Sequence, residues 1–258
     1  MASTISQSSS RKKLRPWILY GLITVLLITP YTLNIWWKFI PSLLLILWLL
    51  RTQSDDYLDR LGLVGNRSLL WLSIGVFGAT FATASVVVPN EMRLNGIELY
   101  RSPAWHLGWA TMPLTQSLGE ELVLRGLLLN GLLAAFKNKR AAIVGAAVVF
   151  AVWHVVFYPI SQNVWLTATT VSTLFLFGLA TNIIFVVTRS IAIPLALHAG
   201  WNLVQFGGEY IDLVTMQSRT EAHVFNAVQG SNTVLSLALG LVFISTLWWQ
   251  RKATHDQN

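Results

Sequence analysis

The sequence predicts an all-α fold, a polytopic membrane helix bundle with about eight transmembrane helices. Of its 258 residues, 54% are hydrophobic and only 11% are charged, whereas a soluble domain carries about 25% charged residues. The charges are also clustered, because Ala141 to Thr188 and Ala222 to Gln250 contain no Asp, Glu, Lys or Arg. A membrane-spanning helix needs about 20 apolar residues, so both stretches are long enough to contain one or more spans.

The expected spans follow one another with short polar connections. The first two are the shortest apolar runs, since Pro30, Lys38 and Pro41 interrupt them. Residues 89–111 contain two prolines and two tryptophans, so we expect an interfacial segment with aromatic side chains at headgroup depth. The eight expected spans are residues 16–34, 35–50, 69–88, 112–136, 141–158, 164–188, 190–208 and 232–250.

Basic residues predict how these spans are oriented. Thirteen of the 18 Lys and Arg residues fall in tails and loops of one side, four fall on the other side, and Arg125 lies within a span. Cytoplasmic loops carry the excess of Lys and Arg, so both termini are expected in the cytoplasm. This distribution also argues against nucleic acid as a partner despite the net charge of +7. The expected location is a prokaryotic plasma membrane, with the lipid bilayer as surroundings.

Three charged residues interrupt the fourth expected span. Glu120, Glu121 and Arg125 are the only Asp, Glu, Lys or Arg residues between Ser102 and Phe136. Each costs about 2.5–3.5 kcal/mol near the bilayer centre, which indicates a function. On a helix Glu121 and Arg125 share a face and can pair, whereas Glu120 points about 100° away. An unpaired carboxylate in an apolar site is suited to proton transfer; alternatively, all three charges only hold helices together.

Two histidines lie in the spans that follow. His154 is the only ionisable residue of the fifth span, and His198 shares a helix face with Asn202 in the seventh, at i, i+4 spacing. A single histidine within a membrane can be a packing residue. Because polar groups in a membrane need partners, polar side chains on three separate spans are best satisfied by one another.

These residues form three motifs that resemble those of a known family. They are Glu120-Glu121-x3-Arg125, Phe150-x3-His154 and His198-x3-Asn202. In this order, each on its own span, they are similar to the motifs of the CPBP family of intramembrane proteases, which includes CAAX proteases and bacteriocin-processing (Abi) proteins. The resemblance covers residues 112–208, which would be the catalytic core. Hydropathy and charge alone predict a cytoplasmic tail over residues 1–15, N-terminal transmembrane helices with an interfacial segment over 16–111, and an outer loop, last helix and tail over 209–258.

The resemblance also implies a role for each residue. Glu120 with His154 would activate a water for attack on a peptide bond, His198 and Asn202 would stabilise the oxyanion, and Glu121 and Arg125 would support Glu120. The cofactor is either none or one divalent metal such as zinc. Two imidazoles and one carboxylate resemble some catalytic zinc sites, so the ligands would be Glu120, His154 and His198.

Several other functions can be weighed from the sequence. The chain has no cysteine, which excludes a cysteine nucleophile, and it has no His-Glu-x-x-His zinc helix. No Asp occurs between Arg60 and Ile211, which excludes an intramembrane aspartyl pair. A proton-coupled transporter and a non-catalytic scaffold or immunity protein remain alternatives. The partner is expected to be a peptide or protein substrate in or near the membrane, of CAAX, bacteriocin or sorting-signal type.

Overall fold

The computed structural model describes residues 67–100, 107–157, 164–207, 209–213, 217–218 and 221–255. The two spans expected over residues 16–34 and 35–50 lie outside the described residues. The helical fold class is confirmed over the described part, and the number of eight spans stays a prediction. Three helices there are long and apolar enough to cross a membrane: Arg67–Leu94, Trp165–Thr188 and Asn232–Thr254.

The helices agree closely with the expected spans, and three short strands accompany them. The elements in chain order are α4 (Arg67–Leu94), β1 (Ile97–Tyr100), α5 (Leu107–Glu121), η1 (Leu122–Leu129), α6 (Asn130–Ala135), α7 (Lys139–Phe157), α8 (Val164–Thr188), α9 (Ala192–Phe206), β2 (Glu209–Asp212), β3 (Gln217–Ser218), α10 (Glu221–Gln229) and α11 (Asn232–His255).

The fourth expected span is not a continuous α-helix. It begins as α5, widens into the π-helix η1 directly after Glu121, and ends as α6. The Leu-rich sequence of η1 gives no local signal for a π-helix, so packing in the bundle must decide it. Long π-helices are rare, and single π turns are frequent at functional sites. In this chain, the change from α-helix to π-helix comes directly after Glu121, at the place where the three charged residues lie.

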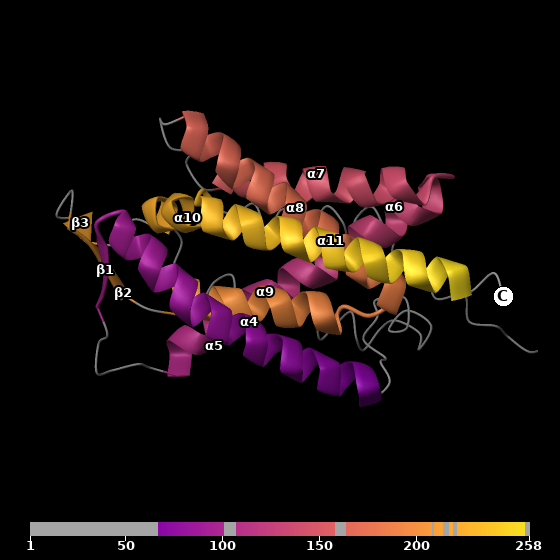
Figure 1. Cartoon of the computed structure of the whole chain (residues 1–258), viewed down its shortest axis with the longest axis horizontal. Helices are drawn as coiled ribbons and strands as arrows, with labels where there is room; N and C mark the ends of the chain where they lie inside the picture. The colour runs from indigo at the N-terminus through magenta and orange to yellow at the C-terminus, as the bar shows by residue number, and fades with distance from the viewer. Residues whose placement is uncertain are drawn as a thin grey trace, which may run out of the picture.

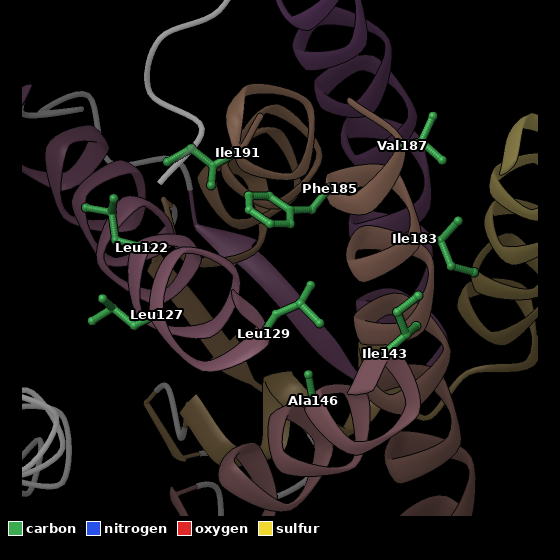
Figure 2. Close-up of a cluster of buried hydrophobic side chains, with 9 residues drawn as sticks. All are labelled: Leu122, Leu127, Leu129, Ile143, Ala146, Ile183, Phe185, Val187 and Ile191. Atoms are coloured by element: carbon green, nitrogen blue, oxygen red, sulfur yellow. The ribbon is translucent and has the colours of Figure 1, made fainter. Parts of the chain in front are cut away.

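Helices α8 and α9 organise the bundle. Helix α8 packs against both α7 and α11, and α9 packs against α4 and α5, as Figure 1 shows. Between η1, α7 and α8 lies a buried apolar cluster (Figure 2) that contains Leu122, Leu127, Leu129, Ile143, Ala146, Ile183, Phe185, Val187 and Ile191. This cluster fixes the helix that follows Glu120 and Glu121 against the rest of the bundle.

A glycine lets α9 approach α4 closely. A Cβ atom on Gly200 would lie 2.9 Å from the backbone oxygen of Phe77 and 3.2 Å from Thr80 Cβ. Real Cβ atoms do not approach a backbone oxygen that closely, so only glycine fits here. Because Gly200 is two residues from both His198 and Asn202, it lies on the opposite face of α9 from them. The contact with α4 thus turns those two side chains toward the bundle interior.

A small antiparallel sheet was not expected from the sequence. Strand β2 pairs with both β1 and β3, joining parts of the expected interfacial segment and the expected outer loop. The loop predicted over residues 209–231 also contains a helix, α10, that was not expected. The end of α10 is bound to α8, because Thr169 Oγ1 donates to the backbone oxygen of Gly230 at 2.8 Å. These segments form one end of the bundle (Figure 1).

The outward faces of α4 and α11 are apolar. Trp71 on α4 is 69% exposed, and Phe243 and Ile244 on α11 are 65% and 64% exposed. The charged motif residues, in contrast, are buried. Apolar side chains outside and paired polar groups inside are the arrangement that a lipid environment favours.

Candidate active site

The structure brings all the sequence-predicted site residues into the bundle interior. Glu120 and Glu121 come from the end of α5 and Arg125 from η1, while His154 comes from α7 and His198 and Asn202 from α9. All six side chains are buried, and Glu121 and Arg125 have no exposed surface. Three segments of the chain therefore contribute to one polar cluster.

Glu121 is held on one side by Arg125. The Arg125 Nη1 atom donates to Glu121 Oε1 at 2.9 Å, which confirms the expected pairing. Arg125 Nη2 donates to the Thr181 hydroxyl of α8, and its guanidinium carbon lies 5.0 Å from the centre of the Phe150 ring. A buried charge is tolerated when it is paired and hydrogen-bonded, and a ring face adds cation–π attraction.

Both histidines are held at Nδ1. His198 Nδ1 lies 2.9 Å from Glu121 Oε1, and His154 Nδ1 lies 2.8 Å from the backbone oxygen of Phe150. A carboxylate and a carbonyl oxygen can only accept, so both Nδ1 atoms carry hydrogen and donate. In the neutral form of each ring, Nε2 is then an acceptor with a free lone pair.

The other glutamate, like Glu121, is bonded at only one of its two oxygens among the described residues. Glu120 Oε1 accepts from Gln116 Nε2 at 3.0 Å. Glu120 Oε2 is buried and has no hydrogen-bond partner among the described residues, although His154 Nε2 lies 3.5 Å away and His198 Nε2 3.7 Å away. With both rings neutral, three acceptor atoms face one another. Such an arrangement is stable when a proton, a hydrogen-bond donor such as water, or a cation lies among them.

Asn202 is attached to the helix that carries Glu120. Its amide nitrogen donates to the Ser117 hydroxyl at 3.2 Å, and that hydroxyl donates to the backbone oxygen of Pro113 at 2.8 Å. Ser117 lies three residues before Glu120, so this bond places Asn202 beside the glutamate's own helix turn. The role of Asn202 toward a substrate stays a prediction.

The sequence interpretation missed several residues of this cluster. Gln116 lies four residues before Glu120, and that helical spacing could have revealed the pair. Thr181 on α8 and Phe225 on α10 come from helices that carry none of the three motifs. The Thr181 hydroxyl accepts from Arg125, and the Phe225 ring stacks on the His154 imidazole. Both reach the site only through tertiary packing, which a single sequence does not reveal.

A metal site was one of two expectations, with Glu120, His154 and His198 as ligands. Within the part of the chain that the structure describes, no group of three or more His, Cys, Asp or Glu side chains is placed to hold a metal ion. The metal alternative stays a prediction, and no chemical step below passes through a metal.

Comparison with known proteins agrees with the motif resemblance. Residues 102–204 match the family model described as type II CAAX prenyl endopeptidase Rce1-like. No curated protein and no solved structure matches the chain. Over residues 102–204, this match bears out the family suspected from the three motifs. With the three long apolar helices, the match supports an integral membrane protease whose substrate is a membrane-associated peptide or protein.

Proposed function

We propose that the protein is an intramembrane endopeptidase in which Glu120 and His154 activate a water. The observation that carries this proposal is Glu120 Oε2, a buried carboxylate oxygen without a described hydrogen-bond partner, 3.5 Å from His154 Nε2. A water placed between these two atoms could donate to both. Its oxygen would then be the nucleophile, in a site from which bulk water is largely excluded.

The proposed reaction needs only protons that these residues can hold. As the water oxygen bonds to the scissile carbonyl carbon, its proton moves to Glu120, and the carbonyl becomes an oxyanion. His198 carries protons on both nitrogens in this proposal, so Nε2 donates to the oxyanion while Nδ1 stays bound to Glu121. Asn202 supplies a second amide hydrogen, and each such donor is worth about 2.7–4 kcal/mol. Glu120 then returns the proton to the leaving nitrogen as the C–N bond breaks.

The description of the matched family favours one substrate class among the alternatives. We favour CAAX-type processing, because the matched family is described as a prenyl endopeptidase; bacteriocin and sorting-signal peptides are the alternatives to be tested. The first experiment uses purified full-length protein in nanodiscs with a membrane-peptide library that includes prenylated CAAX peptides. Wild type, Glu120→Gln and Glu98→Gln are compared, the last being the same change at an exposed strand residue.

The expected result separates the two glutamates. Glu120→Gln should lower cleavage by about 10²–10⁴-fold because the proton acceptor is lost, whereas Glu98→Gln should cleave like wild type. Cleavage that chelator leaves unchanged supports metal-free chemistry. Chelator-sensitive cleavage that zinc restores would overturn it in favour of the ligand set Glu120, His154 and His198. A Glu120→Gln strain that keeps its native phenotype would contradict the enzyme and favour the scaffold.

We also propose that the chain crosses the membrane eight times with both termini in the cytoplasm. Helix α4 begins and α11 ends on the same side of the bundle (Figure 1), and Lys252 near the end of α11 donates to Val187 near the end of α8. These ends carry basic residues, as cytoplasmic ends do.

Because the chain has no cysteine, single cysteines introduced at Ser10 and Thr254 can be tested with an impermeant maleimide. Labelling of either one in intact cells would contradict the orientation.

A further inference from the structure

Helix α10 contributes an aromatic ring to the site from beyond the matched domain. Phe225 lies outside residues 102–204, yet its ring is stacked on the His154 imidazole, with centroids 6.1 Å apart and planes at 7°. On α7 itself, the Phe150 ring lies 4.3 Å from the same imidazole, centroid to centroid. His154 therefore has two aromatic neighbours, of which one comes from its own helix.

The position of Phe225 is fixed by a second aromatic ring and by contacts at the end of α10. Phe206 of α9 stacks on Phe225 with centroids 6.5 Å apart and planes at 15°. Gln229 of α10 donates to the buried Gln205 of α9 at 2.9 Å, and Thr169 donates to Gly230. A Cβ on Gly230 would lie 2.3 Å from Leu166 Cδ1, so the end of α10 is packed without spare room.

A hydrogen bond at Nδ1 does not by itself fix the plane of the imidazole. His154 Nδ1 is bonded to the backbone oxygen of Phe150, and a ring can tilt about such a bond. Parallel aromatic planes restrict such tilting. The tilt matters, since it moves Nε2 relative to Glu120 Oε2, now 3.5 Å away.

We propose that Phe225 is a positioning residue for His154, holding the imidazole plane so that Nε2 faces Glu120. This inference rests on the proposed function of His154 in water activation. It assigns α10, which the family match does not cover, a part in the site. Phe225 acts through His154 and is not itself in contact with the reacting atoms.

The test compares the same substitution at a ring that faces His154 and at a ring outside the site. Phe225→Leu and Phe225→Met remove the ring that faces His154 but keep an apolar side chain of similar size, a class of change that cores tolerate. Phe243→Leu, on the exposed outer face of α11, is the matched control. We expect Phe225→Leu and Phe225→Met to lower kcat about tenfold or more with KM nearly unchanged, while Phe243→Leu stays close to wild type.

A spectroscopic readout makes the result independent of proteolysis. In protein with ¹⁵N-labelled histidine, assigned with His154→Gln, wild-type His154 should show the tautomer with hydrogen on Nδ1. The Phe225 variants should show a mixture with hydrogen on Nε2, and Phe243→Leu should not. An unchanged tautomer and equal kcat in the Phe225 and Phe243 variants would overturn the proposal. If no peptide is cleaved even by wild type, the proposed function fails, and the tautomer still decides whether Phe225 positions the ring.

Discussion

Two adjacent glutamates of one helix end have different partners, although each keeps one buried oxygen without a described hydrogen bond. Glu121 Oε1 accepts from Arg125 and from His198, and Arg125 is bound in turn by Thr181. Glu120 accepts one described bond, from the neutral Gln116, and its other oxygen faces two imidazole nitrogens at 3.5 and 3.7 Å. The difference is that Glu121 is paired with a guanidinium, whereas the open oxygen of Glu120 lies between two imidazoles.

This difference separates stability from chemistry. A buried carboxylate paired with an arginine contributes to holding the fold, and loss of that partner is costly. A buried carboxylate oxygen that faces two imidazole nitrogens without a hydrogen bond is the kind of unsatisfied group that proteins keep mainly at functional sites. We therefore expect changes around Glu121 to affect folding first, and changes around Glu120 to affect activity first.

The largest effect on stability is expected for Arg125→Met. This change leaves Glu121 buried without its charged partner, and breaking a buried ion pair in this way costs about 3–5 kcal/mol. Thermal unfolding in detergent measures it, with Glu120→Gln as the matched change in the other half of the site. Glu120→Gln should unfold at or above the wild-type temperature, because the amide can donate to a histidine. Equal destabilisation by both variants would contradict the division into two halves.

A smaller effect is expected for Thr181→Val. Valine has nearly the shape of threonine but leaves one guanidinium N–H of Arg125 without its acceptor, which costs about 1–3 kcal/mol. Thr181→Ser keeps the hydroxyl and should recover most of the loss. The same unfolding measurement applies to both. A serine variant as unstable as the valine variant would show that Thr181 contributes packing and not the hydrogen bond.

The smallest effect is expected for Gln116→Leu. It removes the one described hydrogen bond to Glu120. Because the glutamine is partly exposed, water can replace it as the donor, so little stability should be lost. We expect a reduced kcat with an unfolding temperature close to wild type. A lower unfolding temperature with normal kcat would place Gln116 in the supporting half.

Much of the fold was predictable because it depends on local composition. The expected span 164–188 coincides with α8, and those over 141–158 and 190–208 differ from α7 and α9 by two residues or fewer at each end. Apolar length and the breaks at charged or glycine residues determine these ends. The sheet, α10 and the π-helical η1 were missed, since hydrogen bonds between distant segments and bundle packing create them.

For the site, the sequence determined which residues are chemically able to act and which of them share a helix face. The spacing of Glu121 and Arg125 predicted their pairing, and three motifs on three spans predicted a shared polar cluster. Only the tertiary structure decided that Glu121, not Glu120, holds His198, and that both histidines turn Nε2 toward Glu120. It also added Thr181 and Phe225. Helical periodicity fixes directions within one helix, but the rotation of one helix against another depends on side-chain packing along the whole contact.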